Sequence, residues 1–402
     1  MQSMFMNSPA TEPDHAVNDL GPLAWVLDEL RKSLEGAAKA LKRFAWDADM
    51  ARGSDLAAVD ASQLRIARQQ LHQAVGALEM VGLAQPALVL RAMEALVQKF
   101  VLQPESCNQD AVTKIEYASF ALSEYLESVL AGKPVSAISL FPQYRDVQEL
   151  LKADRIHPAD LWPFELRWLE PQMALLPHAR SYDAEARSLL DQSVLQLMKG
   201  KAPQAARHLR DLSLGFSANQ TEREPRVFWL MAAAYFEAVA HNLLGSDIYV
   251  RRAASRILLQ YASLSRGDSA ISERLALDLL FFCAQAVSNR TSDTPVLSAV
   301  RFAYDLTRFK PVDYEAVQFG RLGLALLAAA RKRIVSGKEG WSLLGVGETA
   351  KAKLVSELFS LVADSLRKLH PPSEPFVQAL TSAIESATST GQAPSIELAM
   401  EV

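Results

Sequence analysis

Apolar residues recur at steps of three and four along most of the chain, which is the period of an amphipathic α-helix. The stretch 64–83 shows this pattern clearly, and we interpret the rest of the chain against it. One face of the expected helix carries Leu64, Leu71, Val75, Leu78 and Gly82. The neighbouring polar stripe carries Arg65, Arg68, Gln69, His72, Gly76 and Glu79. We therefore expect His72 to lie beside the apolar face of this helix, not within it.

Gly76 lies one turn after His72 on the same polar stripe. A glycine in a helix interior costs about 1 kcal/mol relative to alanine, so its presence calls for a reason. With no side chain at Gly76, another protein could approach the imidazole of His72. The pair predicts an accessible histidine with clearance beside it.

The same periodicity predicts an all-α protein that begins with a bundle of four helices over residues 19–132, in up-down order. Asp19 is expected to cap the first helix, Pro86 to lie in the first turn of the third, and Asp110 to open the fourth, which ends at Gly132. The expected buried positions are Leu23, Leu27, Leu30, Leu34, Leu41, Phe44, Leu88, Met93, Leu96, Phe100, Ile115, Phe120, Leu122, Tyr125, Leu126 and Val129. Residues 1–18 are expected to be a disordered lead-in.

Three further parts are predicted beyond this bundle. Residues 133–181 are rich in proline but also in aromatic and apolar residues, which favours a packed connector over a free linker. Antiparallel helices are expected in a second region, 182–268, and a third, 269–402, which could form bundles or repeat-like stacks. The expected helices lie at 184–200, 202–216, 224–244, 248–264, 274–287, 294–306, 314–335 and 349–369. The last stretch, 391–402, has the pattern of a new helix, so we expect a chain truncated from a longer protein.

Composition and charge narrow the function classes. The net charge of −4 argues against generic binding to nucleic acid, which needs a basic surface. The two cysteines, Cys107 and Cys283, lie far apart in helical contexts and are interpreted as buried free thiols. The chain has no apolar run of the roughly 18 residues that a membrane span requires, and its first residues lack a signal-peptide pattern. We therefore expect a cytoplasmic protein that does not insert into a membrane.

The residues around His72 resemble a known motif. They read His72, Ala74, Val75 and Gly76, followed by Met80, Val81, Gly82 and Leu83. This is similar to the His-containing phosphotransfer (HPt) motif, H-x-L-K-G followed by M-V-G-A. The sequence of this stretch resembles the HPt-like N-terminal region of type IV pilus chemosensory hybrid histidine kinases (ChpA/PilL type). It also resembles that of the related FimL-like scaffold proteins. The segments 140–145 (LFPQYR) and 157–162 (HPADLW) resemble signatures that follow the first bundle in that family.

The resemblance implies an input or scaffold region of a chemosensory phosphorelay that controls type IV pili and twitching motility. Its partners would be response-regulator receiver domains and other pilus signalling proteins. His72 would be the phospho-acceptor, because a neutral imidazole is nucleophilic near pH 7. Val75 stands where the HPt family has lysine. This departure leaves a second interpretation open, in which His72 is a surface histidine used for packing or partner contact.

No other set of residues converges on a catalytic site. His157 precedes Pro158 in a turn and is expected to have a structural role; His178, His208, His241 and His370 show no metal-ligand spacing. The clusters Arg251–Arg252 and Arg331–Arg333 are interpreted as solvated helix faces, with docking of an acidic partner as the alternative. Four aromatic residues are interpreted as core: Phe228, Trp229, Tyr235 and Phe236.

Nucleotide-binding and hydrolase motifs are missing from the sequence, and so are the ATP-binding boxes of a histidine kinase. We therefore expect no cofactor and no catalytic domain, so that the chain cannot autophosphorylate on its own. Two hypotheses remain: an HPt-like scaffold of the pilus system, and a helical protein-interaction module with no phosphorelay role.

Overall fold

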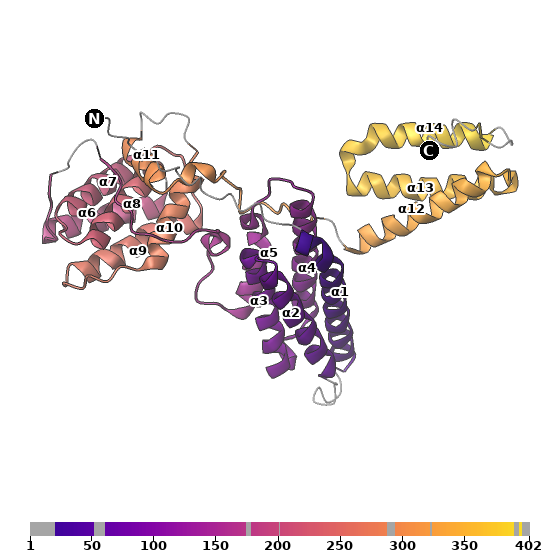
Figure 1. Cartoon of the computed structure of the whole chain (residues 1–402), viewed down its shortest axis with the longest axis horizontal. Helices are drawn as coiled ribbons and strands as arrows, with labels where there is room; N and C mark the ends of the chain where they lie inside the picture. Colours follow the sequence, from indigo (N-terminus) through magenta and orange to yellow (C-terminus); the bar gives the residue numbers. More distant parts are fainter. Residues whose placement is uncertain are drawn as a thin grey trace, which may run out of the picture.

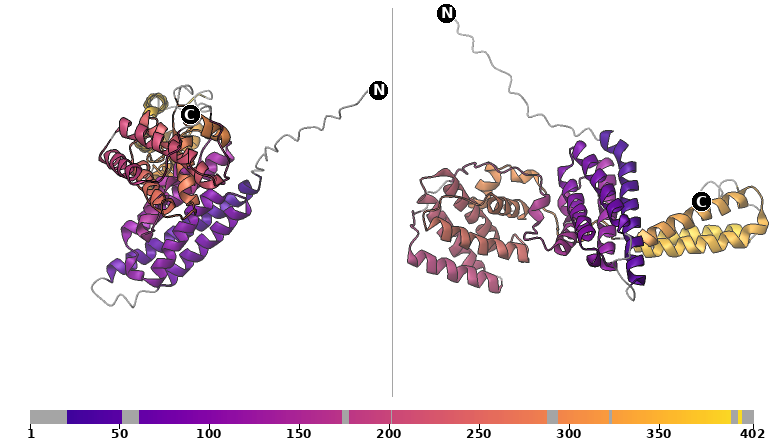
Figure 2. Two further views of the ribbon diagram at one scale, coloured as in Figure 1. Left: turned by 90° about the vertical axis from the view of Figure 1, so that its left-hand side faces the viewer. Right: turned by 90° about the horizontal axis from the view of Figure 1, so that it is seen from below.

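A computed structural model describes residues 21–51, 61–173, 178–200, 202–287, 294–321, 324–389 and 394–395. Within these ranges the chain forms α-helices and short 3-10 helices and no β-strand, which confirms the predicted all-α class. The helices gather in three bodies, and the body formed by α1–α5 lies between the other two (Figure 1 and Figure 2). The expected lead-in, residues 1–18, lies outside the described residues, and so does nearly all of the expected last helix.

The first body is an up-down bundle in which α2 packs along α1, α3 along α2, and α4 along α1 (Figure 1). The four helices are α1 (Gly21–Met50), α2 (Ser62–Met80), α3 (Ala84–Leu102) and α4 (Gln109–Leu130). All but three of the expected core positions are fully buried; Leu88, Phe120 and Val129 are partly buried. The side chain of Asn108, not Asp110, caps α4, because its Oδ1 accepts the N–H of Ala111 at 2.9 Å.

A fifth helix completes this body. α5 (Phe141–Leu151) packs against both α3 and α4. Its aromatic face is buried, with Phe141 and Tyr144 inside, which explains why the proline-rich segment is packed. The chain leaves α5 through Lys152 in the left-handed conformation and reaches a short 3-10 helix, Pro158–Leu161.

The second body is built around one central helix. Its helices are α6 (Ala184–Lys199), α7 (Pro203–Ala218), α8 (Arg223–Ala240), α9 (Ile248–Leu264), α10 (Glu273–Gln285) and α11 (Pro295–Ala303). Helix α8 packs against α7, α10 and α11. It is buried on nearly all sides, so its expected amphipathic character is wrong. The aromatic residues Phe228, Trp229, Tyr235 and Phe236 are all core residues, as the sequence predicted.

The third body has a hydrophobic core of its own. It consists of α12 (Leu324–Gly345), α13 (Ala352–Leu369) and α14 (Glu374–Ser389), packed around Trp341, Leu344, Val355 and Ile384. Helix α14 was not expected from the sequence. The helix expected from Tyr314 was placed too early, because residues 314–321 are not helical and α12 begins at Leu324.

Residues 313–321 instead form a non-helical segment against the first body. The Gln143 side-chain N–H donates to the Phe319 carbonyl at 2.8 Å, and the Gly320 N–H donates to Glu124 at 2.9 Å. The Phe319 ring meets Tyr125 edge-on, with centroids 5.7 Å apart. At Gly320 the backbone φ is +72°, and a Cβ would lie 3.0 Å from the Cβ of Ala121. This position therefore requires glycine.

The predicted domain boundaries stay predictions. Helices α10 and α11 pack against α8, although the predicted boundary at residue 268 assigns them to a different region from α8. The hydrophobic core is continuous from α1 to Phe319, so the first two bodies share it.

Candidate functional site

His72 lies on the solvent side of α2, and its side chain is 74% exposed. Its Nδ1 lies 3.0 Å from Oε1 of Glu94 on α3. An ionised carboxylate only accepts hydrogen bonds, so Nδ1–H is the donor. In the neutral ring the lone pair then lies on Nε2. The arrangement orients the imidazole and leaves Nε2 as its nucleophilic atom.

Open space lies beside this imidazole. A Cβ placed on Gly76 would meet nothing within 4 Å. Helix α2 ends at Met80, three residues earlier than expected, and Gly82 lies in the following turn with φ +79° rather than on the helix face. Its positive φ explains why glycine occurs there. We call the surface formed by Arg68, His72, Gly76 and Glu94 the His72 face.

Charged groups flank the His72 face. Nε of Arg68 lies 3.9 Å from the same Glu94 oxygen that pairs with His72. Beyond Gly76, Arg91 of α3 pairs with Glu79 of α2. Val75 is 6% exposed and packs in the bundle core, so it adds no charge beside the histidine. The His72 face thus holds a positioned nucleophile next to one guanidinium, without the lysine of the HPt motif.

His157 has the opposite environment. It is 5% exposed, and its Nδ1 accepts the N–H of Ala159 at 3.1 Å, while Asp160 accepts the His157 N–H. These two bonds cap the 3-10 helix Pro158–Leu161. Burial lowers the pKa of His157 to about 4, so the ring is neutral at pH 7. The structure places it in the predicted structural role.

A buried ion cluster surrounds His157. Arg155, just after α5, donates two bonds to Asp278 of α10, at 2.9 and 2.7 Å. Arg256 of α9 adds a third at 3.2 Å. Asp278 also lies 3.2 Å from Nδ1 of His157, but this nitrogen cannot donate while it accepts from Ala159. The arginines therefore neutralise Asp278, and the cluster ties the first body to the second.

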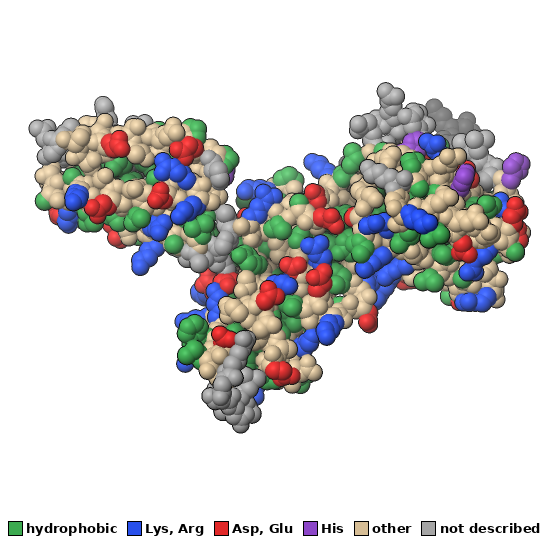
Figure 3. Space-filling view, turned by 180° about the vertical axis from the view of Figure 1, so that it is seen from behind, with side chains coloured by type: hydrophobic (Ala, Val, Ile, Leu, Met, Phe, Trp, Pro, Cys, Tyr) green, Lys and Arg blue, Asp and Glu red, His purple; other side chains and the backbone are tan. Residues whose placement is uncertain are grey.

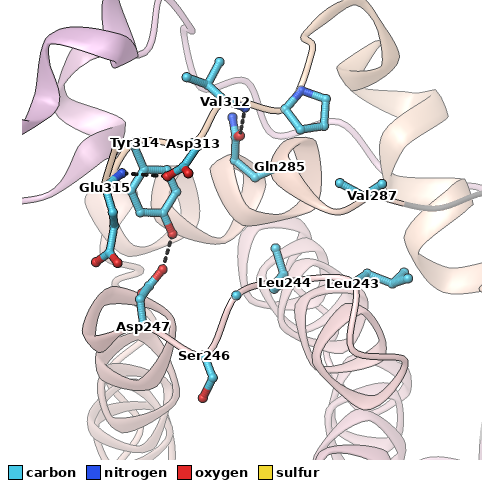
Figure 4. Close-up of a pocket in the computed structure, with 12 residues that line it drawn as sticks. Leu243, Leu244, Ser246, Asp247, Gln285, Val287, Val312, Asp313, Tyr314 and Glu315 are labelled. Carbon is cyan, nitrogen blue, oxygen red and sulfur yellow. Dashed lines mark hydrogen bonds between the residues drawn. The ribbon is translucent and has the colours of Figure 1, made fainter. Parts of the chain in front are cut away.

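A pocket of about 500 Å³ lies between the α8–α9 loop and the segment that follows α11 (Figure 4). Tyr314 donates to Asp247, and the Val312 N–H donates to Gln285 at 2.7 Å (Figure 4). Burial and the Asp247 charge both raise the pKa of Tyr314. Asp313 and Glu315 also line the pocket, and Oδ1 of Asp313 accepts the backbone N–H groups of Glu315 and Ala316. These hydrogen bonds hold the segment that follows α11 in place.

The other candidate residues lie apart from the His72 face. His178 is exposed before α6 and His208 is exposed on α7, and His241 and His370 follow the ends of α8 and α13. On the face drawn in Figure 3, acidic and basic side chains are interspersed. Among the described residues, no group of three or more His, Cys, Asp or Glu side chains is placed to hold a metal ion.

The cysteines and the arginine clusters have ordinary environments. Cys107 and Cys283 are free and buried, and burial raises the pKa of each thiol to about 12. Arg252 and Arg331 are exposed on their helices, whereas Arg333 donates to the Ser365 hydroxyl at 2.8 Å.

The described residues thus define a class: an all-helical protein whose candidate site is a surface histidine on a helical bundle. Comparison with known families gives a more specific similarity for one part of the chain. Residues 177–317 match a family model described as "FimL scaffold protein second domain". This stretch contains α6–α11, so the second body is similar to that domain. No curated protein and no solved structure matches the chain.

The family match supports the FimL-like part of the predicted resemblance. It does not extend to the bundle that carries His72, so the relation to HPt domains and to hybrid kinases stays a prediction. In the described part of the chain, no helix is long and apolar enough to cross a membrane.

Proposed function

We propose that this chain is a helical scaffold protein of type IV pilus regulation. Its His72 face docks the receiver domain of a response regulator. His72 is the phospho-acceptor in this proposal, so that the chain exchanges a phosphoryl group with its partner. The observation that carries the proposal is the exposed His72 imidazole, held by Glu94 and open on the Gly76 side.

The geometry fits the chemistry of phosphoryl transfer. The Glu94 bond fixes Nδ1 as the donor, which leaves the Nε2 lone pair to attack the phosphorus of the receiver's aspartyl phosphate. The P–O bond to the aspartate breaks as the N–P bond forms, and the aspartate leaves as a carboxylate. The product carries added negative charge, and Arg68 lies on the same face to interact with it. The family match of the second body supports the scaffold part of the proposal, since that family is described as a scaffold protein.

The test is phosphate transfer to purified chain. A receiver domain of the pilus chemosensory system is phosphorylated with a radioactive label and mixed with the wild type or with His72→Gln. We expect acid-labile label on the wild type and none on the variant, with Glu94→Gln slower than wild type. A matched control is His208→Gln, which removes another exposed histidine. Equal labelling of wild type and His72→Gln would exclude His72 as the acceptor.

A second candidate function is a scaffold that docks the same partner without phosphotransfer. It is favoured by Val75, which is buried where the HPt motif has lysine. In this case the receiver binds the His72 face and no label transfers. Isothermal titration calorimetry measures receiver binding, and the labelling assay measures phosphoryl transfer. Binding with transfer supports the first function, and binding without transfer supports the second.

A further inference from the structure

We propose that the outer face of α6 and α9 is a second docking surface, which binds an acidic amphipathic helix of a partner protein. Three apolar side chains are exposed there: Leu195 at 56% and Met198 at 38% on α6, and Leu259 at 70% on α9. The hydroxyl of Ser255 on α9 lies 3.5 Å from the Met198 sulfur, so the two helices meet along this face. The proposal does not depend on His72.

The three apolar residues lie at helical spacing on two adjacent helices. Leu195 is three residues before Met198, and Leu259 is four residues after Ser255, so each lies one turn from the contact between the helices. The α6 N-terminus lies near the C-terminal part of α9, because the Tyr261 hydroxyl donates to the Asp183 carbonyl at 3.2 Å. The helices are therefore antiparallel, and the face extends along both.

The charges on this face select the occupant. Helix α9 contains three arginines and no acidic residue. Lys199 at the end of α6 and Arg252 on α9 are exposed, and among the described residues no carboxylate lies within 4 Å of either cation. The acidic residue on the same side of α6, Asp191, is already paired with Arg187 at 3.1 Å. An apolar surface bordered by unpaired cations is complementary to a helix with leucine-like anchors and a carboxylate-rich rim.

The test uses a labelled probe peptide and the full chain. The probe is an 18-residue amphipathic helix of Leu and Glu, and its counterpart has Lys in place of Glu. Binding is followed by fluorescence anisotropy. We expect the Leu/Glu peptide to bind at least tenfold more tightly than the Leu/Lys peptide, and its affinity to fall with added salt. Tighter binding of the Leu/Lys peptide would overturn the proposal.

Point variants locate the site. We expect Leu259→Asp to weaken binding of the Leu/Glu peptide at least tenfold and Arg252→Glu at least fivefold. Both residues are exposed, so the fold is retained. The matched control is Phe302→Asp on α11, an 88% exposed apolar residue of the same body, which should change affinity less than twofold.

Two further outcomes complete the test. His72→Gln should bind the peptide like the wild type, so that failure of the His72 proposal leaves this one standing. The chain could instead self-associate through this face and bind no peptide. If Leu259→Asp then abolishes the self-association, the occupant is a second copy of the chain and the proposal is overturned. Equal peptide affinity of the wild type and Leu259→Asp would overturn it as well.

Discussion

Two histidines of this chain lie next to a carboxylate at nearly the same distance, yet the structure gives them opposite roles. His72 Nδ1 lies 3.0 Å from Glu94, and His157 Nδ1 lies 3.2 Å from Asp278. The His72 side chain is 74% exposed, whereas that of His157 is 7% exposed. The difference teaches that distance to a carboxylate does not define the role of a histidine.

Hydrogen-bond direction and burial decide the roles. Nδ1 of His72 donates to its carboxylate and leaves Nε2 free for a partner. Nδ1 of His157 accepts a backbone N–H, so Asp278 depends on Arg155 and Arg256 for its neutralisation. The exposed pair can therefore act in recognition or chemistry, whereas the buried cluster joins two bodies of the fold.

The largest expected effect is at the buried cluster. Asp278→Asn removes the carboxylate that accepts two bonds from the buried Arg155 guanidinium and one from Arg256, which leaves Arg155 with Asp160 alone. We expect a loss of about 3–5 kcal/mol in the free energy of unfolding. Urea denaturation measures this loss. The matched control is Asp191→Asn, which breaks a half-exposed pair with Arg187 and should cost less than about 1 kcal/mol. A similar cost for both variants would contradict the role assigned to burial.

The second effect is a pH dependence from His157. Its pKa is about 4 in the folded chain, against an ordinary value of 6.5. Between these values the unfolded chain binds more protons, so the free energy of unfolding falls as the pH decreases from 6.5 to 4, by about 3 kcal/mol. Denaturation at several pH values of the wild type and His157→Asn, which retains a capping side chain, isolates this contribution. Parallel pH profiles for the two proteins would refute it.

The third effect concerns residues 313–321, which follow the second body along the chain and pack against the first. Gly320→Ala forces an L-residue to φ +72° and brings its Cβ against Ala121, so we expect a loss of about 1–2 kcal/mol. The same substitution at Gly267, where φ is +88° but nothing lies within 4 Å, shows the backbone cost alone. The melting temperature of Gly320→Ala should lie below that of Gly267→Ala. The reverse order would show that the contact with α4 contributes little to stability.

The smallest effect has the opposite sign. Gly76 is helical and its surroundings are empty, so Gly76→Ala should stabilise the chain by up to about 1 kcal/mol. The expected gain is measured by urea denaturation beside the wild type. Destabilisation by alanine would mean that the space next to His72 is smaller than the structure shows.

The sequence predicted the helices wherever their apolar spacing faces one core. The stripe from Leu23 to Phe44 and the position of His72 beside the α2 face follow from local periodicity alone. Local patterns could not place the pairing of Arg155 with Asp278, which lie 123 residues apart in the chain. Local patterns also failed at residues 314–321, which have helical apolar spacing but do not form a helix. The Tyr314 hydroxyl donates a hydrogen bond to Asp247 instead. Tertiary contacts override local preference at such positions.

The central claim is that the His72 face is a docking surface for a receiver domain. Its most direct test is receiver affinity for the wild type and for Gly76→Leu, measured by isothermal titration calorimetry. A Cβ at residue 76 meets nothing within 4 Å, and a leucine side chain there extends into the space that a partner needs beside His72. The account predicts at least tenfold weaker binding with stability equal to or above that of the wild type. Unchanged affinity in a folded Gly76→Leu variant would contradict it.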